Sequence, residues 1–270
     1  MLSIPVVRVL SACTSVHENL ADAGGADASS SADAAAATAW ASGGTAAMTD
    51  KASYPDPFAG LALTTCSLVC ETTAGPCTST TEARQDVSEG VGGLPVRLAL
   101  KIVDNTCAPV IGAVVEIWHT QKSGVYSGTT PNPQMCEGGD TDAPNHLYFR
   151  GTQTTDAAGR VDFDTCFPGW YTSRAIHIHV QVFVGGTEYV TTQLFFADDL
   201  VQSICASHPD YEARGQPDTT DATDNVIGGV ADQSPYTLTV ARMTDGAMMA
   251  SKVLTIRAAT TESVCSVGGM

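Results

Sequence analysis

The alternating pattern of residues 175–184 constrains the fold of this chain more than any other feature of its sequence. Every second position holds a branched aliphatic residue, namely Ile176, Ile178, Val180, Val182 and Val184. The positions between them include His177, His179 and Gln181. Because successive side chains of a β-strand point to opposite faces, we predict a strand whose aliphatic face packs in a core. The opposite face then carries both histidines.

Residues 94–270 contain further short segments that are rich in β-branched and aromatic residues. They are 96–103, 112–119, 147–154, 161–164, 189–196, 236–243 and 249–257. Asp156 to Gly159 predicts a hairpin turn between 147–154 and 161–164, and Gly185-Gly186 predicts another after residue 184. Helix is expected only over 198–207. Short strands joined by turns predict an all-β fold, an antiparallel β-sandwich, for residues 94–270.

Residues 1–93 do not show the strand pattern of residues 94–270. Residues 1–13 end in Leu10-Ser11-Ala12-Cys13, which is similar to a bacterial lipobox, a signal whose cysteine is lipidated; a chance cysteine is the alternative. Residues 14–51 are mostly Ala, Ser, Gly, Asp and Thr and predict a disordered linker. Residues 52–93, which we call the arm, are irregular and rich in Cys and Thr, and we expect disulfides to hold the arm on the main domain.

The cysteines indicate an oxidising compartment. The chain has 9 cysteines and no C-x-x-C pair, which argues against a zinc ribbon. The spacing of Cys66, Cys70 and Cys77 could hold a metal, but disulfides in an exported protein are favoured. If Cys13 carries lipid, eight cysteines remain, and these can pair completely in a connectivity that the sequence leaves open. We therefore expect an exported protein, either extracellular or lipid-anchored at the bacterial cell surface or periplasm.

The net charge excludes two classes of partner. The chain carries 29 acidic and 13 basic residues, which gives a net charge of −16. Such a surface repels nucleic acid and anionic lipid, so neither is an expected partner. The sequence also lacks an apolar run of the ~20 residues that a transmembrane helix needs.

A metal centre is predicted around the strand of residues 175–184. On one face of a strand, the Cβ atoms of His177 and His179 lie about 7 Å apart, which suits two ligands of one metal ion. Taken alone, the pair leaves alternatives open. The histidines could face solvent, or they could hold copper or zinc together with His119.

Two tyrosines narrow the choice of metal. Tyr171 lies six residues before His177, just after Pro168-Gly169, so the chain can fold its ring back toward the histidines. Tyr126 lies in a second segment that follows the strand of residues 112–119. Two phenolates and two imidazoles make a hard, anionic donor set, which favours ferric iron over zinc or ferrous iron.

These segments carry a family resemblance. They read Trp-His-x4-Gly-x-Tyr-Ser over residues 118–127, Pro-Gly-x-Tyr over 168–171, and Arg-x-x-His-x-His over 174–179. Residues 147–156 and 192–196 add an Arg-Gly-x-Gln-x-x-Asp element and a Thr-Gln-Leu-Phe-Phe strand. In order and spacing, residues 64–200 resemble the intradiol ring-cleavage dioxygenases.

The resemblance implies a fold, a cofactor and a reaction. It implies a prealbumin-like β-sandwich that binds Fe(3+) through four ligands: Tyr126, Tyr171, His177 and His179. Arg174 would stabilise negative charge on the substrate, and Gln193 would be a further polar contact. A catechol-type ring would be cleaved with O2 to a muconate-type diacid. Relatives often associate, which implies a homo-oligomer. The arm follows the family only loosely, so the sequence does not specify which catechol is the substrate.

A second function class stays open at this point. A non-catalytic β-sandwich that binds ligands at the cell surface would also explain the disulfides and the linker, because a fold does not fix a function. It does not explain why two tyrosines and two histidines occur at these spacings.

Overall fold

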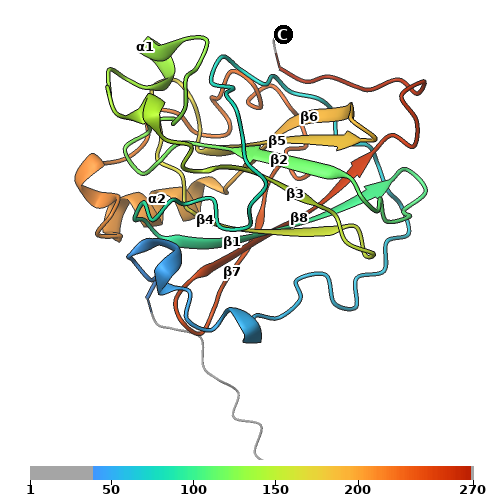
Figure 1. The fold of residues 1–270 in the computed structure, drawn as a ribbon, viewed down its shortest axis with the longest axis horizontal. Coiled ribbons are helices and arrows are strands. Elements are labelled where there is room, and N and C mark those ends of the chain that lie inside the picture. Colours follow the sequence, from blue (N-terminus) through green and yellow to red (C-terminus); the bar gives the residue numbers. More distant parts are fainter. Residues whose placement is uncertain (1–38, 269–270) are drawn as a thin grey trace, which may run out of the picture. The chain divides into compact units, whose positions relative to one another are not determined.

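The structure, a computed structural model, describes residues 39–268 of the 270-residue chain. Residues 1–13 with Cys13, and the part of the predicted linker up to residue 38, lie outside the described residues. Within residues 39–268, the polypeptide forms two four-stranded sheets that pack face to face (Figure 1). The all-β sandwich predicted from the sequence is therefore confirmed.

The first sheet has the strand order β4-β1-β8-β7. Its strands are β1 (Pro95–Asp104), β4 (Arg160–Cys166), β7 (Thr239–Arg242) and β8 (Met248–Ile256). β1 pairs antiparallel with β4 but parallel with β8, in a register that sets Val96 opposite Met248. The parallel β1–β8 pair is the one exception, among the described strands, to the antiparallel pairing that we expected.

The second sheet has the order β3-β2-β5-β6 and is antiparallel throughout. Its strands are β2 (Val114–Trp118), β3 (Arg150–Thr154), β5 (His177–Val184) and β6 (Thr187–Phe195). The aliphatic face of β5 lies in the main core, where Ile178 and Val180 pack with Leu98 and Leu100 of β1 and with Ile117 of β2. The opposite face of β5 is therefore free to form a site.

Helices are short. α2 (Asp198–Ser207) has the bounds predicted from the sequence, and α1 (Pro133–Cys136) is a single turn. Four 3-10 turns complete the described elements: η1 (Gly44–Ala47), η2 (Lys51–Ser53), η3 (Ala143–Asn145) and η4 (Glu212–Arg214). None of the helices described in residues 39–268 is long and apolar enough to cross a bilayer.

The hairpin predicted at Asp156 to Gly159 is wrong. The turn itself forms, because the Asp156 carboxylate accepts hydrogen bonds from the backbone N–H groups of Ala158 and Arg160. The strands on either side belong to different sheets, however, since β3 pairs with β2 and β4 pairs with β1. The buried Thr155 explains the switch, because its hydroxyl donates to Val110 O and accepts from Ala113 N and so fixes the crossing point.

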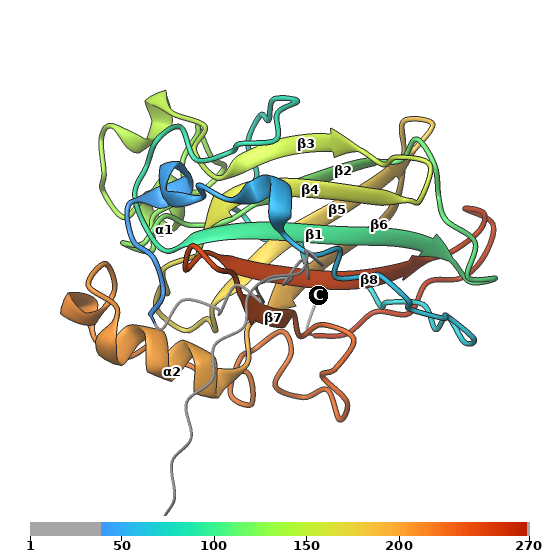
Figure 2. The same cartoon turned by 90° about the horizontal axis from the view of Figure 1, so that it is seen from below.

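The linker predicted over residues 14–51 is wrong for residues 39–51, which pack on the first sheet (Figure 2). The Arg242 guanidinium lies 4.1 Å from the Trp40 ring centre, and Ala41 N donates to Gly246 O at 2.8 Å. Small residues permit this contact. A Cβ atom at Gly246 would lie 3.0 Å from Ala39 O, so the two backbones approach closely only because glycine is there. A composition typical of a linker thus also suits tight packing.

Three disulfides hold the arm. They are Cys66–Cys107, Cys70–Cys265 and Cys77–Cys136. The arm thus lies against the sandwich as expected, with Thr72 N donating to Thr191 O of β6.

Complete pairing of the eight cysteines after Cys13 does not occur. Cys166 of β4 and Cys205 of α2 are buried free thiols that pack in the main core as small apolar side chains. A side chain that fills a core position in this way needs no disulfide partner.

Candidate active site

The two histidines of β5 lie on the sheet face that points away from the main core, as the alternation predicts. His179 sits opposite Trp118 of β2 and opposite Gln193 of β6, and His177 sits opposite Phe195. Both imidazoles are almost completely buried, with 3% and 2% of His177 and His179 exposed. They therefore line an interior site and do not face solvent.

Four predicted donor atoms meet at one point. His177 Nε2 and His179 Nε2 lie 3.2 Å apart. Tyr126 Oη lies 3.4 Å from His177 Nε2 and 3.2 Å from His179 Nε2. Tyr171 Oη lies 3.5 Å from His177 Nε2. The structure thus gathers all four side chains that the sequence singled out as ligands, although Tyr126 is 53 residues from His179 along the chain.

Two glycines let the tyrosine segments approach each other. A Cβ atom at Gly169 would lie 2.3 Å from Lys122 O, and one at Gly124 would lie 2.1 Å from Trp170 O. Any larger residue at either position would push apart the loop that carries Tyr126 and the turn that carries Tyr171. The Pro-Gly element thus brings the two phenols to one place.

Hydrogen bonds orient the His177 ring and hold the backbone at Tyr126. His177 Nδ1 lies 2.6 Å from Ala175 O, and a carbonyl oxygen only accepts. Nδ1 therefore carries the proton, and the Nε2 lone pair points into the cluster. The Tyr126 backbone N–H donates to Cys136 O at 2.8 Å.

The electrostatics of the cluster suit a cation. Burial and the nearby Arg174 charge lower the pKa of His177 to about 3, and burial lowers the pKa of His179 well below its usual range. Burial, followed by the neighbouring Tyr171, raises the pKa of Tyr126 far above its usual range. Burial also raises the pKa of Tyr171. All four groups are thus neutral in the protein alone, and a bound cation would favour the phenolate forms.

The four donor atoms could bind a metal ion only if the tyrosine oxygens act as ligands together with the two histidines. Within residues 39–268, no group of three or more His, Cys, Asp and Glu side chains is arranged to hold a metal ion. Neighbouring donors about 3.3 Å apart are nevertheless what metal–ligand bonds of about 2.0–2.1 Å produce around one ion. The spacing of the four donor atoms is compatible with such an ion, and phenolate oxygens match a hard, highly charged cation.

His119 does not join this group. Its Nδ1 donates to Thr120 O at 2.8 Å, and its Nε2 accepts from the Thr165 hydroxyl at 2.7 Å. Because both ring nitrogens are occupied, His119 is not available as the third ligand of a copper or zinc site. Its role is structural, since both of its ring nitrogens bond to neighbouring residues of the fold.

Arg174 and Gln193 lie beside the four donors. Arg174 Nη1 lies 3.4 Å from Tyr171 Oη, and Nη2 donates to Gln193 Oε1. Gln193 Nε2 in turn donates to Thr73 O of the arm at 2.7 Å. A Cβ atom at Gly75 would lie only 3.7 Å from His179 Cε1, so the arm backbone passes directly beside this histidine.

Two residues at the site were missed by the sequence interpretation. The Asp224 carboxylate pairs with Arg174 Nε at 2.8 Å, and no sequence pattern links a residue 50 positions further along the chain to that arginine. The guanidinium of Arg150 lies 5.9 Å from the Tyr126 ring centre and donates to Ser127 O and Cys77 O. Arg150 belongs to the Arg-Gly motif quoted above, so the motif could have pointed to it.

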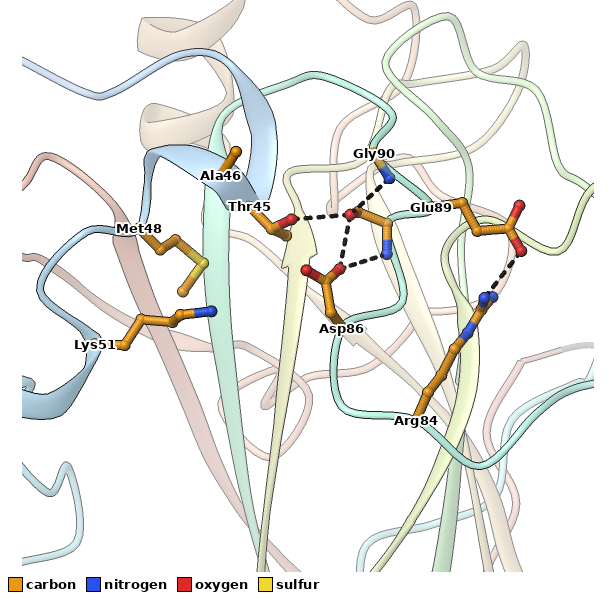
Figure 3. Close-up of a pocket in the computed structure, with 9 residues that line it drawn as sticks. Thr45, Ala46, Met48, Lys51, Arg84, Asp86, Glu89 and Gly90 are labelled. Carbon is orange, nitrogen blue, oxygen red and sulfur yellow. Dashed lines mark hydrogen bonds and ion pairs between the residues drawn. The ribbon is translucent and has the colours of Figure 1, made fainter.

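A cavity elsewhere in the protein, shown in Figure 3, does not belong to this site. It lies between residues 45–51 and the arm, and none of the four donors lines it. Its charged groups are already paired, since Lys51 contacts Asp164 and Arg84 contacts Glu89. The first contact joins the N-terminal residues to β4, and the second lies within the arm.

Comparisons with known proteins show to which family this fold belongs. The family model described as Dioxygenase matches residues 72–210, slightly more than half of the chain. This chain belongs to the intradiol ring-cleavage dioxygenase family.

Individual relatives are distant. The chain is 30% identical over 131 residues to a chlorocatechol 1,2-dioxygenase of Pseudomonas sp. (strain P51), a match that covers 42% of this chain and 47% of that protein. It is 29% identical over 109 residues to catechol 1,2-dioxygenase 1 of Acinetobacter lwoffii, covering 34% and 32%. The chain thus spans about half or less of the curated relatives that it matches.

One solved structure is matched over a larger share of its own length than these curated relatives are. The intradiol ring-cleavage dioxygenase from Tetranychus urticae is 27% identical, with a TM-score of 0.61, and the match covers 71% of this chain and 95% of that one.

Proposed function

We propose that this chain is an iron(III)-dependent intradiol dioxygenase that cleaves catechol-type rings with O2 to muconate-type diacids. The observation that carries the proposal is the meeting of two phenol oxygens and two imidazole Nε2 atoms, in which each phenol oxygen lies 3.2–3.5 Å from at least one Nε2 atom and the two Nε2 atoms lie 3.2 Å apart. Tyr126, Tyr171, His177 and His179 would hold the iron. When bound, the ferric ion supplies a Lewis acid that draws electron density from a deprotonated catechol.

The protein's own residues would prepare the site for an anionic substrate. Arg174 supplies a buried positive charge beside Tyr171, where it would stabilise negative charge on a catecholate. Tyr171 is more exposed than the almost completely buried Tyr126, so its oxygen, as the phenolate that a bound cation would favour, would be the one better placed to accept a proton from an incoming catechol. Gln193, held by Thr73, would keep Arg174 in place from the other side.

Metal and oxygen measurements test this proposal. The purified protein is expected to contain about one iron per chain and to be red, because phenolate-to-iron(III) charge transfer absorbs visible light. Oxygen uptake should be measured with catechol, protocatechuate, hydroxyquinol and a chlorocatechol, since the substrate's ring substituents are open. An iron-loaded but colourless protein, or no oxygen uptake with any of these catechols, would contradict the proposal.

We further propose that the protein is exported. Three disulfides support this, because such bonds form and persist in oxidising compartments. Lipid attachment at Cys13 and association into a homo-oligomer belong to the same proposal and need their own tests. Cell fractionation, mass spectrometry of the N-terminal peptide and sedimentation analysis address the three points in turn; a reduced protein found only in the cytoplasm would contradict export.

A further inference from the structure

Asp224 is the most completely bonded carboxylate near the site. Its side chain is fully buried. One oxygen accepts from Arg174 Nε and from Ala175 N, each at 2.8 Å. The other accepts from the backbone N–H groups of Val226 at 2.8 Å and Ile227 at 3.2 Å. A carboxylate held by this many donors cannot reorient without leaving buried groups unpaired.

We infer that Asp224 is a positioning residue for the reaction proposed above, acting through Arg174. The inference rests on that proposed function. The Asp224 carboxylate holds the guanidinium by its Nε edge. Nη1 then faces Tyr171 Oη, and Nη2, which also lies 3.5 Å from Asp224 Oδ1, faces Gln193 Oε1, toward the candidate metal ligands.

The geometry of arginine makes such an arrangement effective. A guanidinium is planar and carries its N–H groups in a fixed fork, so fixing the Nε edge also fixes the directions of the other N–H groups. Both partners are buried, with 7% of Arg174 and 3% of Asp224 exposed. Charge-assisted hydrogen bonds of this kind are stronger and more directional than neutral ones. Arg174 is therefore presented to a substrate in one orientation.

The same stretch of chain holds the turn that carries Tyr171. The Trp170 indole N–H donates to Gly215 O at 3.1 Å, and Arg214 Nη2 donates to Trp170 O at 2.8 Å. The Ser173 backbone N–H donates to the Asp218 carboxylate at 3.1 Å. Residues 214–224 thus contact residues 170–175 at several points, and Asp224 is the contact nearest the site.

The segment that supplies Asp224 lies outside the part of the chain that the family model matches, which ends at residue 210. The metal donors, Arg174 and Gln193 all lie inside the matched part. The proposed positioning residue is thus contributed by a segment of this chain beyond the family match, folded back onto the site.

The principal test compares Asp224→Asn with Asp221→Asn. The control makes the same Asp→Asn change in the same segment, and none of the hydrogen bonds among the described residues joins Asp221 to Arg174. For Asp224→Asn we expect kcat for oxygen uptake with catechol to fall about 10–100-fold, somewhat less than removal of a direct donor costs, with KM changed less than about threefold. Asp221→Asn should keep both constants. Equal effects in the two variants would overturn the inference.

A double-mutant cycle separates positioning from a general structural effect. If Asp224 acts through Arg174, Asp224→Asn should cause no further loss of kcat in an Arg174→Gln background. Additive losses would contradict the inference. If Asp224→Asn does not fold, Arg174→Lys replaces it as the test variant. Lysine keeps the positive charge beside Asp224 but lacks the planar fork of N–H groups, so kcat should still fall. An unchanged kcat in Arg174→Lys would overturn the inference.

A structural readout keeps the inference distinct from the proposed function. Crystal structures of the wild type and Asp224→Asn should differ in the direction of the Arg174 guanidinium, whether or not iron is bound. If the wild type consumes no oxygen with any catechol, the proposed function fails, and these structures alone decide the positioning claim. An Arg174 side chain that keeps its orientation in Asp224→Asn would then refute it.

Discussion

The indole of Trp118 and the imidazole of His179 stack face to face, with ring centroids 4.6 Å apart and planes only 5° from parallel. The two residues are opposite one another in the β2–β5 ladder, so the backbone register sets the stack. His179 Nδ1 has no hydrogen-bond partner among the described residues, unlike His177 Nδ1. Packing against Trp118 is therefore the main restraint on the His179 ring.

Replacing Trp118 should reveal this restraint. Trp118→Ala would leave a cavity beside His179 and lower the free energy of unfolding by about 3–5 kcal/mol. Trp118→Phe keeps an aromatic face and should cost less. Denaturant unfolding and iron content per chain measure the two effects together. Equal stability and equal iron content in both variants would show that the stack does not hold His179.

Removing one phenol oxygen tests the donor set. Tyr126→Phe keeps the ring but loses the oxygen nearest both histidines, so iron affinity should fall at least about tenfold and the visible absorption should weaken. Tyr148→Phe is the matched control, because Tyr148 is also buried but its hydroxyl accepts from Gln121. Metal titration followed by visible spectroscopy compares the two, and a colour unchanged in Tyr126→Phe would exclude Tyr126 as a ligand.

Two disulfides should differ in their effect on the site. Removing Cys77–Cys136 or Cys66–Cys107 by paired Cys→Ser changes should each cost about 2–5 kcal/mol of stability. Only the first is expected to reduce iron content as well, because Cys136 O holds the Tyr126 backbone and Cys77 O holds Arg150. Thermal unfolding and metal analysis of both double variants check this. Iron loss of the same size in both would contradict a local effect.

His119 should make stability depend on pH. Burial lowers its pKa to about 4, whereas an unfolded histidine titrates near 6.5. The contribution of neutral His119 to the free energy of unfolding is complete above about pH 6.5. It is lost as the pH falls toward 4, because in this range a proton binds to His119 in the unfolded chain but not in the folded protein. The slope from this residue is at most about 1.4 kcal/mol per pH unit. The free energy of unfolding, measured with urea at several pH values from 7 to 4.5, should depend less steeply on pH in His119→Gln than in the wild type. An equal pH dependence in the two proteins would mean that His119 does not contribute.

Periodicity predicted most of the sandwich. The alternation of residues 175–184 gave β5 and its two faces, and the segment predicted as helix became α2. Periodicity does not say which sheet a strand joins, and β3 and β4 were therefore paired wrongly. Composition likewise does not distinguish a linker from a segment of small residues that packs tightly, as residues 39–51 do.

Residues of the site could be predicted from the sequence only where they belong to the family motifs or to the alternating strand. Strand geometry alone placed His177 and His179 on one face, but their meeting with Tyr126 depends on loops that no local rule describes. The family resemblance pointed to those loops. It did not reach Asp224, because that residue lies beyond the matched region and its contact with Arg174 exists only in the folded chain.

The disulfide between Cys70 and Cys265 has a consequence for the order of events during synthesis. Its two cysteines are 195 residues apart, and the arm that passes beside His179 is attached at Cys70. This bond cannot form until residue 265 has left the ribosome. The wall of the site near Gly75 can therefore be fastened at Cys77 before residue 265 emerges, and a chain truncated before residue 265 would lack only the second fastening, at Cys70.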